Sequence, residues 1–241
     1  MSQTHDAAQP AGTPAAPAAS EGLTDLLGLL AYAELDAFFR LSDDAAMAPT
    51  LADKAALGEM AVAEFSHFER IRAELQRLGA DPDRAMAPFT APLDDFHVRT
   101  APSDWLEGLV KAYVGDGMAT DFYRAIAEVL DPRPRALVLE VLADTGHAQF
   151  AVEHVRAAIA ADPKVAGRLA LWARRLVGEA LSQAQRVAAQ RPSLAYLVVP
   201  VGEAADGGEP AGASQLGDIG RMFARLTDAH AQRMDALGLS G

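Results

Sequence analysis

Residues 57–75 read LGEMAVAEFSHFERIRAEL, and this stretch decides the fold. Its large apolar residues recur at steps of three and four, which predicts one core-facing stripe on a long helix. Glu64 and His67 lie in the middle of that stripe. Because a buried acid is unfavourable unless it has a partner, the pair indicates either a metal site or a hydrogen-bonded polar seam.

A similar pair recurs further along the chain, where Asp144 and His147 share an apolar face. We expect this second pair in the middle of one continuous helix over residues 134–162. The helices expected before the two pairs each place a single acid among apolar residues. These acids are Glu34, in the helix expected at 23–47, and Asp116, in the helix expected at 103–130 and capped by Ser103.

The spacing of these residues predicts that they meet. In an antiparallel helix hairpin, residues equidistant from the turn lie at the same height. Pro49 lies midway between residues 34 and 64, and the Asp131–Pro134 turn lies midway between residues 116 and 147. Two such hairpins packed together would bring four carboxylates and two imidazoles to one point. The predicted metal ligands are Glu34, Glu64, His67, Asp116, Asp144 and His147.

Two further acids are alternatives. Asp121 is the alternative to Asp116 on its helix, although its spacing places it near Glu128 and Arg124, on the expected solvent side. Glu140 lies one turn before Asp144 and is either a ligand or a hydrogen-bond acceptor for one. His154, two turns after His147, is expected to be a hydrogen-bonded core histidine.

The charge of the ligand set indicates two metal ions. Four buried carboxylates would repel one another, and two divalent cations balance their charge. The chain has no cysteine, so thiolate metal sites and iron–sulfur clusters are excluded. Oxygen and imidazole ligands suit two Fe ions, with Mn as the alternative.

The fold class predicted from these patterns is all-α, a four-helix bundle with two additional C-terminal helices. Residues 1–20 are rich in Ala and Pro and are expected to form a disordered tail. The metal-binding helical domain is expected at 21–191, with helices also at 51–79 and 164–190. Residues 80–102 are expected to be an irregular connection with a short helix near 93–98. A linker is expected at 192–214, and a helix packed on the same domain at 215–238.

Residues 23–191 resemble the ferritin-like superfamily. Within it, the chain is similar to the hydroxylase-like relatives of the bacterial tRNA hydroxylase that acts on 2-methylthio-N6-isopentenyladenosine (MiaE-like). The resemblance lies in the segments Ala63–Glu69, Tyr113–Gly117 and Ala143–His147. It implies a ferritin-like di-iron bundle and the same six ligands. The family's usual residue is Glu where this chain has Asp116 and Asp144, so the helices that carry them must approach the metals more closely.

The function expected from the ligands and the resemblance is that of a non-haem di-iron carboxylate protein. It would be an O₂-dependent hydroxylase or monooxygenase of a small or nucleoside-like substrate, with the electron donor left open. One alternative is a metal-binding or ferroxidase-type protein without an organic substrate. A second is a bundle that has lost a metal and serves as an interaction module, and a third is a tRNA-modifying hydroxylase.

The charge distribution bears on the partners. The formal net charge of −12 disfavours tRNA and other polyanions. A basic stripe of Lys164, Arg168, Arg175 and Arg186 on one helix face could meet phosphates, or could pair with acids on neighbouring helices. We expect a cytoplasmic protein with no secretory signal and no membrane span, with a homodimer as one option and the oligomeric state left open.

Overall fold

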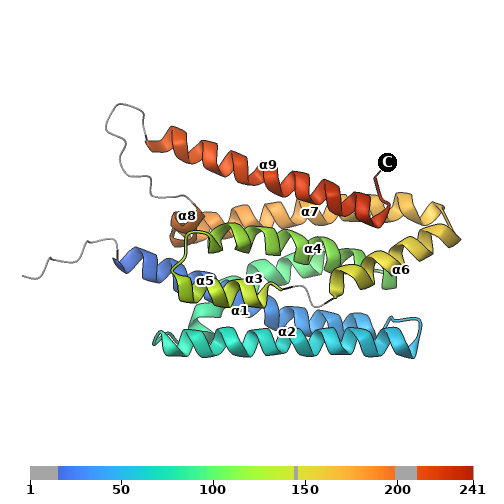
Figure 1. Cartoon of the computed structure of the whole chain (residues 1–241), viewed down its shortest axis with the longest axis horizontal. Coiled ribbons are helices and arrows are strands. Elements are labelled where there is room, and N and C mark those ends of the chain that lie inside the picture. The colour runs from blue at the N-terminus through green and yellow to red at the C-terminus, as the bar shows by residue number, and fades with distance from the viewer. Residues whose placement is uncertain (1–15, 144–145, 199–210, 241) are drawn as a thin grey trace, which may run out of the picture.

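The structure is a computed structural model that describes residues 16–143, 146–198 and 211–240 (Figure 1). Within these ranges the chain forms nine helices and no strand, which confirms the all-α fold class. The helices are α1 (Ala16–Ala45), α2 (Leu51–Arg77), α3 (Pro82–Arg99), α4 (Trp105–Ala127), α5 (Pro132–Val141), α6 (His147–Ala161), α7 (Lys164–Gln190), α8 (Pro192–Val198) and α9 (Ala211–Leu237). In the part of the chain described, no helix is long and apolar enough to cross a membrane.

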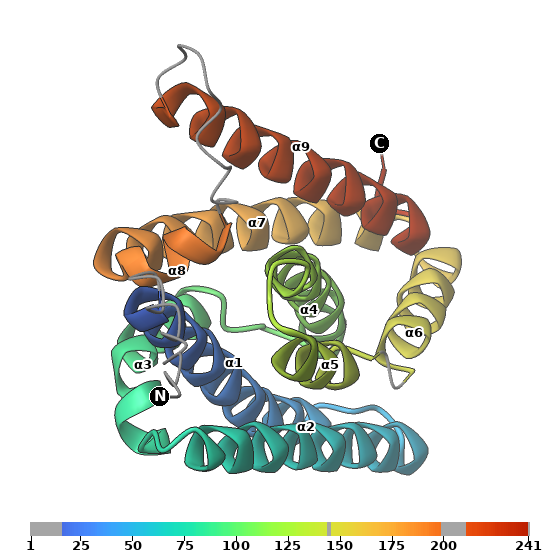
Figure 2. The same cartoon turned by 60° about the vertical axis from the view of Figure 1, so that its left-hand side comes forward.

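The helices form a layered bundle with α4 in its interior. Both views place α4 between the antiparallel pair α1–α2 on one side and α7 with α9 on the other (Figures 1 and 2). The two halves of α4 join different apolar clusters. Val110 and Val114 pack with residues of α6, α7 and α9, whereas Tyr123 and Ile126 pack with residues of α1, α2, α3 and α5. The middle of α4 therefore lies between the two main parts of the core.

Helix α3 corrects the expectation of an irregular connection over residues 80–102. Asp81 caps it by accepting hydrogen bonds from the backbone N–H groups of Asp83 and Arg84, and Pro82 occupies its first turn. Pro88 and Pro92 lie inside the helix and had indicated irregular backbone. The helix buries one apolar face against α1, and this packing outweighs the local preference of the prolines.

The contact between α1 and α3 is unusually close at Gly28. A Cβ added at Gly28 would lie 2.2 Å from the carbonyl oxygen of Ala85. Real Cβ atoms do not come this close to backbone oxygen, so only glycine permits this spacing of the two helices. The spacing fixes the depth of α1 in the bundle.

The continuous helix expected over residues 134–162 is wrong. The structure divides it into α5, which ends at Val141, and α6, which begins at His147. Gly146 precedes α6 with a φ of 99°, a left-handed conformation that a helix interior does not permit. Asp144 lies outside the described residues, and His147 starts a new helix instead of following Asp144 on one helical face.

Several boundaries also differ from expectation. Helix α1 begins at Ala16, within the tail expected at 1–20, while residues 1–15 lie outside the described ranges. Helix α8 occupies the start of the linker expected at 192–214 and packs on α1, and α9 begins at 211 rather than 215. Asp104 caps α4 in place of Ser103, since it accepts the Glu107 N–H, while Glu107 binds the N–H and hydroxyl of Ser103. Helix α7 has the predicted bounds, 164–190.

Candidate metal centre

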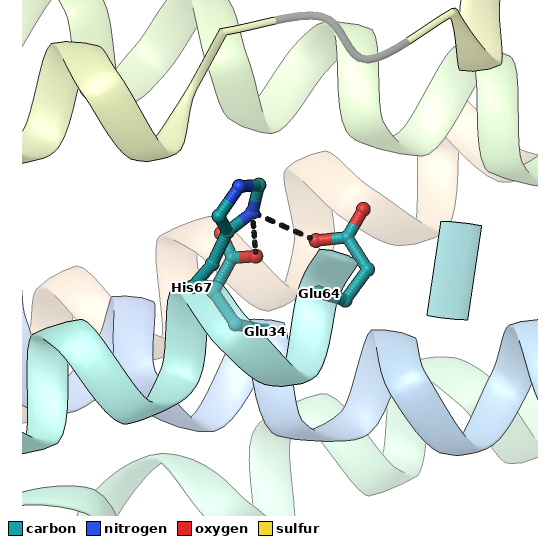
Figure 3. Close-up of side chains that lie close together, drawn as sticks. All are labelled: Glu34, Glu64 and His67. Atoms are coloured by element: carbon teal, nitrogen blue, oxygen red, sulfur yellow. Dashed lines mark hydrogen bonds and ion pairs between the residues drawn. The ribbon is translucent and has the colours of Figure 1, made fainter. Parts of the chain in front are cut away.

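Helices α1 and α2 bring three of the six predicted ligands together. Glu34 extends from α1, and Glu64 and His67 extend from α2 (Figure 3). Nδ1 of His67 lies 3.3 Å from Oε2 of Glu34 and 3.4 Å from Oε2 of Glu64. One donor atom from each residue lies within 4.8 Å of the others, and Glu34 is buried. This is the arrangement of donors that can hold a metal ion.

His147 reaches the same group from the first residue of α6. Its Nδ1 lies 3.3 Å from Oε1 of Glu64, while the other carboxylate oxygen of Glu64 faces His67. Glu64 therefore lies between two imidazoles, one from its own helix and one from α6. A carboxylate with a different histidine at each oxygen can bridge two metal positions.

The protonation of this cluster shows the electrostatic problem that a cation would resolve. Burial raises the pKa of Glu34 well above its ordinary value and neighbouring Glu64 raises it further, although His67 opposes both effects. Hydrogen bonds that the His67 ring donates to Glu34 and then to Glu64 raise the pKa of His67 to about 9. Burial opposes ionisation of Glu64, but its hydrogen bonds with His67 and Glu34 lower its pKa. Without a metal, bound protons offset the negative charge of the Glu34 and Glu64 carboxylates, and a divalent cation would offset it more fully. The oxygen and imidazole donors fit iron or manganese.

A cavity of about 330 Å³ adjoins the cluster. Glu34, Glu64, His67 and His147 line it, together with residues from α4 and Arg233 from α9. Much of the remaining wall is formed by short or apolar side chains: Ala33, Ala37, Ala119, Val141, Leu142, Ala143 and Ala148. Short side chains where helices face one another leave room for a small molecule, and volumes of this size are typical of ligand sites.

Helix α4 contributes two acids to this cavity. Asp116 is exposed and lines the cavity, but it is not part of the Glu34–Glu64–His67 group. Asp121 also lines the cavity, and its Oδ2 accepts a 2.7 Å hydrogen bond from Nη1 of Arg233. The expectation that Asp121 faces solvent beside Arg124 is wrong, because α9 packs on α4 and covers that face.

The other histidine and acid singled out in the sequence lie away from the cavity lining. Glu140 is 62 % exposed and forms an ion pair with Arg70 of α2, so it is not a ligand in this arrangement. Its helix, α5, ends before the cluster. His154 has hydrogen-bond partners at both ring nitrogens, the Phe150 carbonyl and Asp53, as expected, but its side chain is 29 % exposed and does not lie in the core.

Several cavity residues were not identified from the sequence as parts of a site. Arg233 and Arg124 both line the cavity, and Arg124 also donates a hydrogen bond of 3.3 Å to the carbonyl of Leu142. Tyr123 of α4 also lines the cavity. Burial and then the charge of Glu34 raise the pKa of its hydroxyl.

The basic stripe on α7 is largely paired within the chain. Arg168 forms ion pairs with Asp104 and Glu107, at 2.7 and 2.6 Å. Arg186 forms an ion pair with Asp95 at 2.9 Å, and Arg175 donates to the carbonyl of Arg99 at 2.6 Å. These contacts favour the interpretation that the stripe pairs with neighbouring helices.

Comparison with known proteins places this chain in a family. Residues 18–201 match the family described as a ferritin-like domain of actinomycetes, and the chain belongs to that family. Its fold is also similar to that of a solved structure from Synechococcus, "Protein 19 with aldehyde deformylating oxidase activity". The TM-score is 0.62 and the identity 18%, over 93% of this chain and 98% of that one. At this identity the likeness concerns the fold alone. No curated protein matches the chain in sequence.

Proposed function

We propose that the chain is a non-haem di-iron oxidoreductase that uses O₂ to oxidise a small organic substrate. The observation that carries this proposal is the buried Glu34–Glu64–His67 group, with His147 at the second oxygen of Glu64, on the wall of a cavity. Membership of a ferritin-like family and similarity to the fold of an aldehyde deformylating oxidase support it.

The chain offers ligands for two metal positions. Glu34, Glu64 and His67 would hold the first ion. His147 would hold the second, and Glu64, which lies between His67 and His147, would serve both. Asp116, which lines the cavity, and Asp144 would complete the second position, as the sequence pattern predicts. Histidine and carboxylate ligands from facing helices are the set that ferritin-like di-iron proteins use.

The reaction class is set by what such a centre provides and by what the cavity admits. Iron bound there would supply the reduction of O₂. In a hydroxylation, one oxygen atom enters a C–H bond of the substrate and the other leaves as water. Balance then requires two protons and two electrons from an external reductant, such as a reduced flavin or iron–sulfur protein. The apolar walls would exclude bulk water from the reacting carbon.

The size of the cavity favours a small molecule over a nucleic acid. About 330 Å³ admits a small molecule or a single nucleobase-sized group. A bound tRNA would also need a basic docking surface outside the cavity. Three of the four residues in the α7 stripe are already engaged with acids or a carbonyl of the same chain. We therefore place the small-molecule substrate ahead of the tRNA-modifying alternative.

Metal analysis combined with O₂ uptake tests the proposal. Protein purified from iron-supplied cells should contain close to two iron ions per chain. With NADH and phenazine methosulfate as electron source, O₂ uptake should increase when a substrate from a panel of small organic compounds is added. Uptake that follows only added Fe(II), whatever organic compound is present, would favour the ferroxidase-type alternative. Absence of bound transition metal would contradict both.

A further inference from the structure

The guanidinium group of Arg233 lies at the cavity wall, and two of its three nitrogens make no hydrogen bond within the described residues. Its side chain is 13 % exposed, and Nη1 donates to Asp121 at 2.7 Å. Nε and Nη2 are buried and make no hydrogen bond within the described part of the chain. These two nitrogens form one edge of the guanidinium plane, the edge that binds two oxygens of a carboxylate side by side.

Gly117 is the reason that Arg233 can lie there. A Cβ added at Gly117 would lie 2.6 Å from Cδ of Arg233 and 2.8 Å from its Nε. Glycine in a helix interior costs about 0.5–1 kcal/mol relative to alanine. In this position its lack of a side chain lets a guanidinium lie directly against α4, next to the cavity.

We propose that Arg233 recognises a carboxylate on the substrate, with the Nε–Nη2 edge as the binding group. The inference rests on the proposed function, because it places the reacting carbon between this anchor and the Glu34–Glu64–His67 group. Buried guanidinium donors without partners are costly, and a bidentate carboxylate would satisfy both donors at once. The substrate class is therefore a small organic acid.

A carboxylate fits this wall better than a phosphate ester. Asp121 already accepts one hydrogen bond from Arg233 and balances its charge, and Asp116 and Glu64 line the same cavity. A dianion would meet more repulsion there than a monoanion. The single free edge also offers two adjacent donors, which match the two oxygens of a carboxylate.

The competing interpretation is that Arg233 only ties α9 to α4 through Asp121. That role predicts lower stability when either partner is replaced and no preference for charged ligands. Recognition predicts that the protein prefers an anion over its neutral analogue and that this preference depends on Arg233. The ratio of the affinity for an anion to the affinity for its neutral analogue therefore distinguishes the two roles.

The test uses the full-length protein as purified. Calorimetry measures its dissociation constants for two probes, hexanoate and hexanamide. Hexanoate should bind at least about 10-fold more tightly than hexanamide, as expected for charge-assisted hydrogen bonds. Arg233→Met should reduce this ratio to about 1. Asp121→Asn should lower the melting temperature, as Arg233→Met does, and keep the preference for hexanoate. An equal ratio in the wild type and Arg233→Met would overturn the proposal.

Two glycine variants guard against a loss of folding. Gly117→Ala favours the helix but displaces the guanidinium, so it should also lower the ratio. Gly115→Ala is the matched control, because its added Cβ meets no heavy atom within 4 Å. It should keep the wild-type ratio, and a loss equal to that of Gly117→Ala would overturn the role of Arg233. Tighter Arg233-dependent binding of hexyl phosphate than of hexanoate would overturn the carboxylate assignment.

Metal content measured on the same samples separates the two proposals. Arg233-dependent binding of hexanoate in protein without iron would contradict the di-iron function and keep the anion site. Iron-loaded protein that shows no preference for the carboxylate would keep the di-iron function and contradict the anion site. Binding of hexanoate directly to the metals would be insensitive to Arg233→Met and so counts against the inference.

Discussion

Nδ1 of His147 lies 3.3 Å from Oε1 of Glu64, and this contact joins α6 to the α1–α2 hairpin. It brings together two segments that are far apart in the sequence. The contact forms although the chain is broken between α5 and α6, so that His147 does not lie on the continuous helix expected over residues 134–162. The geometry therefore depends on where α6 begins, and not on a continuous helical face.

The first prediction concerns metal content. His147→Ala should remove at least one metal ion per chain, because it deletes the imidazole at the second oxygen of Glu64. His154→Ala is the matched control on the same helix, since its ring binds Asp53 and a carbonyl instead. Inductively coupled plasma mass spectrometry of both proteins measures the effect. A full complement of metal in the His147→Ala variant would contradict the assignment of His147 as a ligand.

The second prediction concerns stability without metal. Ions that bind only the native state stabilise it, by about 4 kcal/mol when they are present at about 1,000 times Kd. Removing them with a chelator should therefore lower Tm by several degrees. Glu34→Gln should reduce the difference in Tm between the metal-bound and metal-free protein. The substitution weakens metal binding, and the neutral amide has nearly the same shape as a protonated carboxyl group. The same Tm before and after verified metal removal would count against a buried centre.

The third prediction distinguishes the two acids of α4. Asp116→Asn should lower metal content. Asp121→Asn should leave metal content nearly unchanged but destabilise the fold by about 1–3 kcal/mol, since it removes the negative charge from the group that accepts the hydrogen bond of Arg233. Metal analysis and chemical denaturation measure the two effects. Metal loss in the Asp121 variant alone would move the fourth carboxylate ligand to Asp121.

The fourth prediction is a pH dependence at Glu74. Hydrogen bonds from Arg77 and Arg133 lower the pKa of this carboxyl from near 4.5 to about 2. A depressed pKa in the folded state contributes stability above the ordinary value and loses it as the pH falls from about 4.5 toward 2. Glu74→Gln should cost about 1 kcal/mol at pH 7, because both arginines are largely exposed.

The difference in stability between Glu74→Gln and the wild type should then shrink as the pH is lowered through that window. Urea denaturation at several pH values measures it. Glu69→Gln on the same helix is the control, since Glu69 and its partner Arg72 are exposed and 3.7 Å apart. A difference that stays constant down to pH 2.5 would argue against the depressed pKa.

The fifth prediction concerns tRNA. We expect weak or undetectable binding even at low salt, where contacts with phosphates are strongest. The Arg168→Glu/Arg175→Glu double variant should therefore change little in a low-salt titration, although it loses the contacts of Arg168 with α4. Tight binding by the wild type that disappears in this variant would restore the tRNA-modifying alternative.

Much of the fold could be predicted from local sequence signals. The three- and four-residue spacing of apolar residues gave the long helices, and the bounds of α7 agree with it. Pro49 and its neighbours marked the turn between α1 and α2, and the equal distances from that turn indicated that Glu34 and Glu64 lie at one height. The structure brings those two residues together with His67.

Other features depend on contacts that local signals do not contain. Pro88 and Pro92 argue against a helix, and only the packing of α3 on α1 makes it stable. The apolar spacing near Asp144 predicts one helix, yet the left-handed Gly146 ends that continuity. Arg233 follows a Gly-rich linker, and nothing in its spacing indicates that α9 covers the cavity.

The close approach at Gly28 carries a consequence for sequence comparison. Gly28 lies less than two turns before Glu34 on α1, and its backbone touches Ala85 of α3. A larger residue at either position would push the helices apart and shift Glu34 relative to Glu64 and His67. Related chains can therefore share every candidate ligand and still differ in the separation of those ligands. In assessing which homologues share the proposed chemistry, positions 28 and 85 belong with the candidate metal ligands.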